Sequence, residues 1–401
     1  MQKGAAMHAQ RIVDRFVNER LALHAARRPS WGAAIWAAMR GRVLSLSSLA
    51  RAIAGGGTVK SALKRMERLV GGARVESEAQ EVAAALLGGW RCLGVPLAIA
   101  VDWSALDPGS RHVEWRAAVT WLGMGRGLTV YSRVCPLRQL GSAKVERALL
   151  AALRGWIAAD VQVVIVTDAG FRRPWFAQVE ALGWGWIGRV RAGVKLGGPA
   201  VDGQRQWGSA QQWFAQATGC AQRHSDCALT RRYAWGCDLV LWHGPRRERT
   251  EYRRAGRGGT AKARGAARRS AAEPWVLAHS PRLRHLRPDE IVAMYARRMQ
   301  IEEHFRDTKS IALGMGLEHS RSRSAPRLHA LLPIHTVAAF LLWHIGQWAE
   351  SEGLQRRVQL TSRKTRELSV VRLAVLLCAH ELIPLSATAR RQLGHRLGVR
   401  L

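Results

Sequence analysis

Three carboxylates occupy positions where an uncompensated charge would be destabilising. Asp102 ends the apolar run in the stretch VPLAIAVDWS, and Asp168 ends the run in VQVVIVTDAGF, so each acid is expected at the end of a strand. Both runs predict buried strands, in which an Asp is unfavourable unless it is paired or binds a cation. Glu302 lies further along, in a helical stretch. Three carboxylates are the oxygen ligands that a pair of Mg²⁺ ions requires, so these residues predict metal-assisted phosphoryl transfer. For Asp168, an ordinary Asp that begins a turn is the alternative.

A second group of chemically active side chains lies in the stretch YARRMQIEEHFRDTKS, which contains neither Gly nor Pro and predicts one helix. At about 100° per residue, Arg298, Glu302 and Lys309 fall within roughly 60° of Tyr295. The apolar stripe of the helix runs beside this line, so the four groups are expected at the rim of a buried face. Glu303 is rotated about 80° to the other side and is expected to point to solvent. Taken alone, the pattern also fits an amphipathic helix with solvated charges.

The charge balance indicates a polyanionic partner. The 401 residues carry a formal net charge of +33, and the sequence pI is near 11.6. With 48% hydrophobic and 23% charged residues the composition is that of a globular protein, and nucleic acid fits this excess of charge better than a membrane surface does. Residues 245–270 contain ten Arg or Lys. We expect this stretch to be a mobile loop that faces phosphate, a merely solvated loop being the alternative.

The sequence gives no sign of export or of a membrane span. The first residues, MQKGAAMHAQRIVDRF, lack the apolar run of a signal peptide. The most apolar stretch, Ala330 to Trp348, includes Pro333, His335 and His344, so it predicts a buried helix. Six Cys without a CxxC pair fit a reducing cytosol. Four residues could in principle hold zinc, although their spacing favours free core thiols: Cys220, His224, Cys227 and Cys237.

The order of the predicted elements suggests an α/β core between helical ends. From residue 95 the patterns read as three strands, a helix, a strand, a helix and a strand, followed by shorter strand-like runs. Near the start, SLSSLARAI and VKSALKRMERLV are compatible with a helix-turn-helix, or with a small helical bundle that has a basic face. The second segment carries Lys60, Lys64, Arg65 and Arg68.

The sequence predicts five regions. Residues 1–88 form a helical DNA-binding region, and residues 89–191 form the first part of the catalytic core. A mainly β insertion with the basic loop follows over 192–280, then the second part of the core, with the helix that carries Glu302 (the Glu helix), over 281–345, and a helical C-terminal region over 346–401.

This order of strands and helices resembles the ribonuclease H-like fold, and the three acids resemble the DDE triad of transposases. Tyr295, Arg298, Glu302 and Lys309 match the Tyr-(2)-Arg-(3)-Glu-(6)-Lys signature of the insertion-sequence-four family at all four positions and in all three gaps. The segment TDAGF resembles the second-Asp region of that family, and the long insertion before the Glu helix is a further shared trait. The resemblance covers about residues 95 to 345 and is weaker at both ends.

The resemblance implies a mixed α/β fold with a ribonuclease H-like core, interrupted by a mainly β insertion and flanked by helical regions. It implies an enzyme that cuts double-stranded DNA at transposon ends and joins those ends to target DNA. Asp102, Asp168 and Glu302 would hold two Mg²⁺ ions, with Mn²⁺ as a substitute. A homodimer in the synaptic complex, association with the nucleoid in a bacterial cytoplasm and no contact with a membrane are also expected.

The resemblance further assigns residues to the DNA. Tyr295, Arg298 and Lys309 would contact phosphates beside the cut, a role that suits the fork of Arg and the point charge of Lys. Trp275 would stack on a flipped base, although a core Trp is the alternative in a chain with 17 Trp.

Two other functions remain compatible with the sequence. A ribonuclease H-like nuclease would use the triad without joining strands, and the four-residue signature and the insertion argue against it. A catalytically silent DNA-binding repressor derived from a transposase would explain the charge but would not require the triad.

Overall fold

The computed structural model has a mixed α/β fold, which confirms the predicted fold class. It describes residues 2–41, 43–55, 57–88, 96–106, 109, 111–120, 125–244, 273–311, 314–322, 324–360, 367–383 and 386–401. The basic stretch 245–270 lies outside the described residues, so its predicted role as a phosphate-facing loop stays a prediction.

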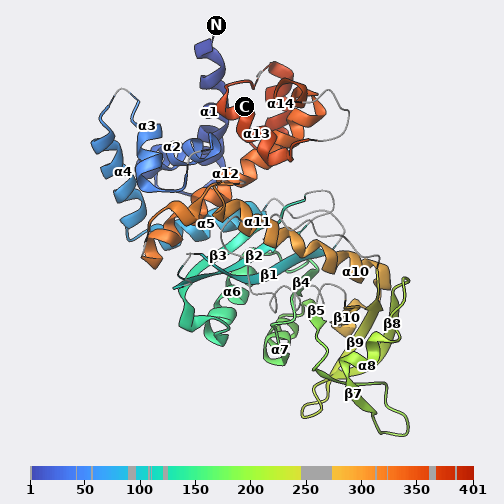
Figure 1. The fold of residues 1–401 in the computed structure, drawn as a ribbon. Helices are drawn as coiled ribbons and strands as arrows, with labels where there is room; N and C mark the ends of the chain where they lie inside the picture. Colours follow the sequence, from blue (N-terminus) through green and yellow to red (C-terminus); the bar gives the residue numbers. More distant parts are fainter. Residues whose placement is uncertain are drawn as a thin grey trace.

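One mixed sheet runs through the molecule, with strands in the order β3-β2-β1-β4-β5-β10-β9-β8-β6-β7 (Figure 1). Its strands are β1 Leu97–Ala105, β2 His112–Val119, β3 Leu128–Pro136, β4 Val163–Thr167, β5 Gly185–Val190, β6 Lys195–Gly197, β7 Trp207–Ser209, β8 Gln222–Leu229, β9 Trp235–Trp242 and β10 Trp275–His279. Strands β1 and β4 are parallel, as are β4 and β5, whereas β10 pairs antiparallel with both β5 and β9. The strands of the predicted insertion therefore extend the central sheet.

Helices cover both faces of this sheet (Figure 1). Among those that pack on it are α6 Ala143–Trp156, α7 Arg173–Ala181, α10 Pro288–Arg297 and α11 Met299–Lys309. A short helix, α8 Ala210–Phe214, lies in the insertion. Ile99 and Val101 of β1 belong to the cluster of buried residues that includes α6 and α7. Ala100, on the opposite face, packs instead against Ile301 of α11. Because side chains alternate along a strand, Asp102 must point to the α11 face.

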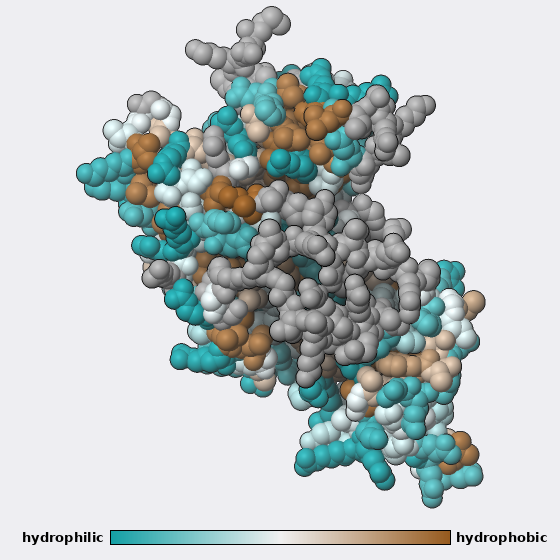
Figure 2. Space-filling model, viewed as in Figure 1, coloured by the Kyte–Doolittle hydropathy of each residue, from teal (hydrophilic) through white to brown (hydrophobic). Residues whose placement is uncertain are grey.

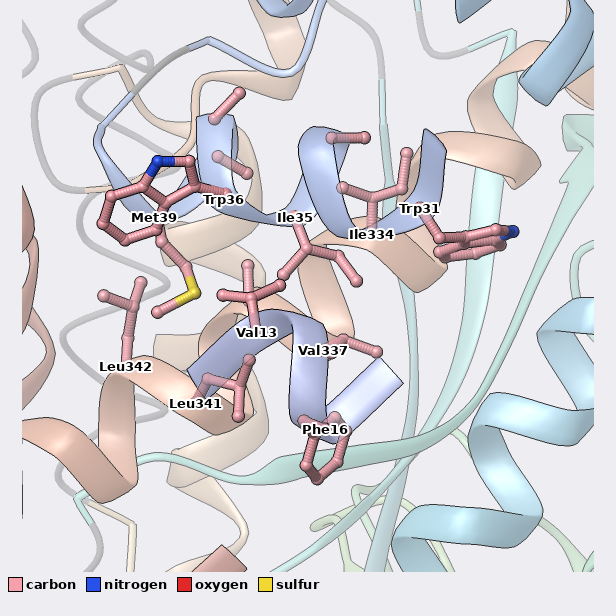
Figure 3. Packing of buried hydrophobic residues seen from close by; sticks show 14 of the residues in the cluster. Val13, Phe16, Trp31, Ile35, Trp36, Met39, Ile334, Val337, Leu341 and Leu342 are labelled. Carbon is pink, nitrogen blue, oxygen red and sulfur yellow. The ribbon is translucent and has the colours of Figure 1, made fainter. Parts of the chain in front are cut away.

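The chain ends form a helical layer beside the sheet. It consists of α1 Gln2–Arg20, α2 Arg28–Met39, α3 Leu46–Ile53, α4 Val59–Gly71, α5 Val75–Gly88, α12 Ala325–Ser351, α13 Val370–Ala379 and α14 Ala387–Leu397. Val13 and Phe16 of α1, Ile35 of α2 and Val337 and Leu341 of α12 interdigitate in its core (Figure 3). Helix α12 is long and apolar enough to cross a membrane, but 72% of its most apolar window is buried inside the protein. This confirms the buried helix that its Pro and His residues predict.

Helices α3 and α4 lie where the sequence predicts two short amphipathic helices. The side chain of Thr58 caps α4 by accepting a hydrogen bond from the Ser61 backbone N–H at 3.2 Å. Lys60, Lys64 and Arg68 are exposed, and α4 lies on a hydrophilic edge of the surface (Figure 2). The fourth predicted base, Arg65, instead donates a hydrogen bond from Nε to Ser30 Oγ on α2 at 2.8 Å.

Candidate active site

The two Asp residues of the predicted triad come from adjacent parallel strands. Asp102 lies within β1, which continues to Ala105, so it does not end the strand as the sequence suggested. Asp168 follows the last residue of β4, as predicted. The register pairs Ala100 with Val166, and two further residues along each strand bring Asp102 level with Asp168. Both side chains therefore project at the sheet face that α10 and α11 cover.

The predicted single helix is divided at Arg298. Helix α10 ends at Arg297 and α11 begins at Met299. The backbone N–H of Arg298 donates to Tyr295 O at 3.0 Å, and that of Ile301 donates to Arg298 O at 3.1 Å. Such three-residue hydrogen bonds tighten the helix locally. The uniform rotation of about 100° assumed from the sequence is therefore wrong across this junction.

Arg298 joins two of the predicted carboxylates. Its Nη1 lies 3.3 Å from Asp102 Oδ2, and its Nη2 donates to Glu302 Oε1 at 2.5 Å. Arg298 is 8% exposed, so its contact with Asp102 is largely shielded from water, whereas the Glu302 side chain is 41% exposed. Asp168 Oδ1 accepts a hydrogen bond from the Gly170 backbone N–H at 2.8 Å. The structure thus brings together residues almost 200 positions apart in the chain.

The charge environment of Asp102 includes both of the other acids. Burial raises the pKa of Asp102 to about 7; the charge of Arg298 opposes this shift, and the charges of Asp168 and Glu302 add to it. Negative charges that interact through a poorly solvated region are stabilised by any cation that enters it. In this structure Arg298 supplies that positive charge.

A divalent cation fits the donor atoms but requires a rearrangement. Within the described parts of the chain, no three His, Cys, Asp or Glu side chains converge as a metal site, and the Arg298 guanidinium contacts both Asp102 and Glu302. Carboxylate oxygens are the ligands that Mg²⁺ and Mn²⁺ prefer, so the set is chemically suitable once Arg298 moves away. Among the described residues, Cys220, His224, Cys227 and Cys237 do not converge either.

Lys309 anchors the end of α11 to β1. Its Nζ donates to Ser104 Oγ at 2.7 Å and to Ala105 O at 3.1 Å. Ser104 lies two residues after Asp102 and therefore on the same face of the sheet. The ammonium group consequently lies at the edge of the same site as the acids.

Aromatic side chains border the site on the α10 side. Tyr295 is 5% exposed, and burial raises the pKa of its hydroxyl above the usual value of 10.0. The ring of Trp275 packs edge-on against that of Tyr295 at 4.8 Å and lies 5.0 Å from that of Trp242. Trp275 is half-buried beside a cluster of buried residues, so it has both a packed and an accessible part.

Glu303 lies in a different environment from Glu302. Its carboxylate pairs with Arg306 and lies 3.8 Å from Arg126 Nη1. The expectation that Glu303 simply points to solvent is therefore wrong, since two guanidinium groups hold it. Its partners, Arg126 and Arg306, are different from Arg298, the residue that contacts Asp102.

Sequence reasoning missed a buried ion pair beside the acids. Arg116 of β2 is 1% exposed and makes two hydrogen bonds to Glu114, which is 0% exposed. The run HVEWRAAVTW carries this signal, because two opposite charges alternate with apolar residues inside a predicted strand. In such an alternation the two charged side chains share one face.

Comparison with known proteins gives one family match. The model of the family described as the transposase DDE domain matches residues 127–341, which is more than half of the chain. The matched range includes Asp168, Tyr295, Arg298, Glu302 and Lys309 and begins after Asp102. A comparison with curated proteins finds no match. Among solved structures, a piggyBac transposase synaptic complex with hairpin DNA is similar at 10% identity and a TM-score of 0.36, over 99% of this chain and 72% of that one.

Proposed function

The chain belongs to the transposase DDE domain family, and from this membership we propose that it is a cut-and-paste DNA transposase of the insertion-sequence-four type. The proposal includes a ribonuclease H-like core formed by β1 to β5 with α6, α7 and α11. The shared contact of Arg298 with Asp102 and Glu302 is the observation that carries it. This contact unites two of the predicted acids with the Arg of the signature.

Each residue has a role that its position supports. Asp102, Asp168 and Glu302 would hold a divalent cation, Mg²⁺ in a two-ion arrangement, which when bound polarises the phosphodiester and activates the attacking oxygen. Arg298 is the residue best placed to move from the acids to a phosphate, because its fork fits either partner. Lys309 supplies a second positive charge beside Ser104, and Tyr295 supports Arg298 from α10, its ring centroid lying 5.9 Å from the guanidinium carbon.

The proposed reaction has two steps. First, a water oxygen bonds to the phosphorus at the end of the element, and the bond from that phosphorus to the 3′ oxygen breaks. This leaves a 5′-phosphate on one side and a free 3′-hydroxyl on the other. The hydroxyl oxygen then bonds to a phosphorus either of the opposite strand, which makes a hairpin end, or of target DNA. In each case it displaces the 3′ oxygen that this phosphorus carried. The acids, Arg298 in its phosphate-bound position and Lys309 would serve both steps.

The partners proposed follow from charge and family. A net charge of +33 favours double-stranded DNA, both transposon ends and target, through contacts to phosphate that do not depend on sequence. Joining two ends to one target is most simply done by a homodimer. We place the protein in a bacterial cytoplasm, associated with the nucleoid.

The proposal is tested with purified protein and the ends of the DNA element that encodes it. With Mg²⁺ we expect protection of the end sequence, a cut at the element boundary and joining of the freed 3′ end to a plasmid. Cutting without joining would support a nuclease, and protection without cutting would support a silent DNA-binding protein. Either result would overturn the proposed function.

A further inference from the structure

The sheet face beneath α11 is attached to that helix largely through polar contacts. Within the described residues, the apolar cluster at this contact consists of Ala100, Ala118, Ile301 and Phe305. Ala100 and Ala118 lie opposite each other on β1 and β2, and their small side chains let the helix approach the sheet closely. So small an apolar contact does little to fix how far α11 slides or turns on the sheet.

A buried ion pair lies next to this cluster. Arg116 donates from Nε to Glu114 Oε1 at 2.6 Å and from Nη2 to Glu114 Oε2 at 2.9 Å, the two-point geometry of an Arg fork. Ser132 of β3 also donates to Glu114 Oε1, at 2.7 Å. The carboxylate is thus held by two strands, and it orients the guanidinium toward α11.

The oriented guanidinium contacts two successive turns of α11. Arg116 Nη2 donates to Thr308 Oγ1 at 2.9 Å, and the guanidinium carbon lies 4.2 Å from the centroid of the Phe305 ring. Thr308 is 0% exposed, so water cannot replace the hydrogen bond that its hydroxyl accepts from Arg116. Glu302 lies one turn before Phe305, and Lys309 directly follows Thr308. A shift of the Arg116 contact would therefore move both residues of the site.

The strand register places the Glu114–Arg116 ion pair beside the residues of the candidate site. Asp102 is paired with Arg116 across the β1–β2 ladder, and Ser104, which accepts from Lys309, is paired with Glu114. The side chains of paired residues project on the same face of a sheet. The ion pair consequently fixes α11 against the two residues of β1 with which Glu302 and Lys309 must align.

We propose that Arg116 is a positioning residue for phosphoryl transfer, an inference that rests on the proposed function. Held by Glu114, it sets the height and rotation of α11 so that Glu302 faces Asp102 and Lys309 faces the phosphate. Stability alone does not explain the pair, because a buried ion pair is often no more stabilising than apolar residues of similar volume. A directional fork provides what apolar packing cannot, which is a fixed register between helix and sheet.

The decisive experiment compares Thr308→Val with Thr308→Ser in the full chain. Val keeps the shape but loses the hydroxyl contacts with Arg116, with His304 O at 2.9 Å and with His335 Nε2 at 3.3 Å, whereas Ser keeps the hydroxyl that makes all three. At saturating element-end DNA and Mg²⁺ we expect Thr308→Val to cut roughly 10–100-fold more slowly, since small misplacements have effects of this size. The KM for DNA should change about 2-fold or less, because the phosphate contacts are spread over many Lys and Arg residues. Thr308→Ser should cut at nearly the wild-type rate.

Two further measurements separate positioning from folding. Arg116→Lys keeps the charge near Glu114 but loses the fork, and we expect it to lower kcat as Thr308→Val does. Affinity for Mn²⁺ without DNA, measured by electron paramagnetic resonance, should fall several-fold in Thr308→Val and stay unchanged in Thr308→Ser. The matched control is Asp238→Asn on β9, which breaks the ion pair of a 0% exposed carboxylate with Arg284, a pair that includes neither α11 nor Arg116.

The outcomes are distinct. Wild-type rates and Mn²⁺ affinities in Thr308→Val would overturn the positioning role, and so would losses that merely track melting temperature as they do in Asp238→Asn. A wild-type protein that binds Mn²⁺ but does not cut would overturn the proposed function, while the Mn²⁺ comparison would still decide the role of Arg116.

Discussion

Glu302 and Glu303 are adjacent in the chain, but their carboxylates belong to different charge networks. Glu302 accepts from Arg298, the residue that also contacts Asp102 on β1. Glu303 pairs with Arg306 on its own helix and lies near Arg126. The two acids have similar side-chain exposure, 41% and 32%, so burial does not distinguish them as catalytic candidates. Their partners do.

This difference predicts opposite effects of the same substitution. Glu302→Gln keeps the shape of the side chain but removes the charge that a cation needs, so cleavage of element ends should fall by about 10³-fold or more. Glu303→Gln should retain most of the activity, because its carboxylate contacts Arg side chains away from Asp102. Parallel cleavage assays in Mg²⁺ measure both. An inactive Glu303 variant beside an active Glu302 variant would contradict the assignment of the third acid.

The strand positions of Asp102 and Asp168 lead to the second prediction. Asp102→Ala or Asp168→Ala should abolish cleavage and leave DNA binding largely intact, because binding depends on Lys and Arg contacts to phosphate. Nicking assays and gel shifts on the same end DNA separate the two properties. Asp160→Ala, at an exposed Asp after α6, is the control and should behave as wild type. Near wild-type nicking by either strand variant would remove that Asp from the site.

Local sequence patterns predict the places of these acids well. The apolar runs around Asp102 and Asp168 are long enough to define buried strands, and the strand period fixes which face each residue occupies. What the patterns do not contain is contact between distant segments. The hydrogen bond of Arg298 with Asp102 spans 196 positions, and that of Arg116 with Thr308 spans 192. The pairing of β10 with β5 also joins segments that are far apart in the chain. Local periodicity does not show which strands pair, so the continuation of the sheet into the insertion was not predictable.

The junction at Arg298 is a feature that the sequence could not predict for a different reason. Nothing in the residues around it breaks a helix, since Gly and Pro are absent from the stretch that contains it. In the folded protein Arg298 is buried and its guanidinium is held by acids from β1 and α11. These tertiary contacts accompany a tightened turn that intrinsic helix propensity does not encode.

The raised pKa of Asp102 gives a pH prediction for the metal-free protein. Burial raises this pKa from its usual 3.8 to about 7, so the folded state binds a proton that the unfolded state releases. This contribution to stability is fully present below pH 4 and is lost as pH rises through about 7. Wild type should therefore lose stability relative to Asp102→Asn between those pH values, by up to a few kcal/mol.

Urea unfolding of both proteins in chelator, at pH values of about 4, 6 and 8, measures this difference. The free energy of unfolding of Asp102→Asn should exceed that of wild type most at the highest pH. A difference that stays constant, or that shrinks as pH rises, would show that the Arg298 contact outweighs burial.

The accessible part of Trp275 leads to the last prediction. If its ring holds a flipped base at the cut, Trp275→Ala should lose about 1–3 kcal/mol of stacking and slow any hairpin step more than the first nick. The ring already packs against Tyr295 and Trp242, so it is held in place before DNA binds. Stacking a base on it would therefore cost little further side-chain entropy. The rates of nicking and of hairpin formation on one end substrate measure the two steps.

The control for this variant is Trp213→Ala, at a half-buried Trp of α8 whose ring packs against His224 at 5.3 Å. It removes a similar aromatic contact in the insertion, made with His224 and not with Tyr295 or Trp242. We expect both steps to stay near wild type in this control, while Trp275→Ala separates them. Equal slowing of both steps in Trp275→Ala, or a melting temperature that falls far below that of the control, would identify Trp275 as a packing residue that supports Tyr295 from β10.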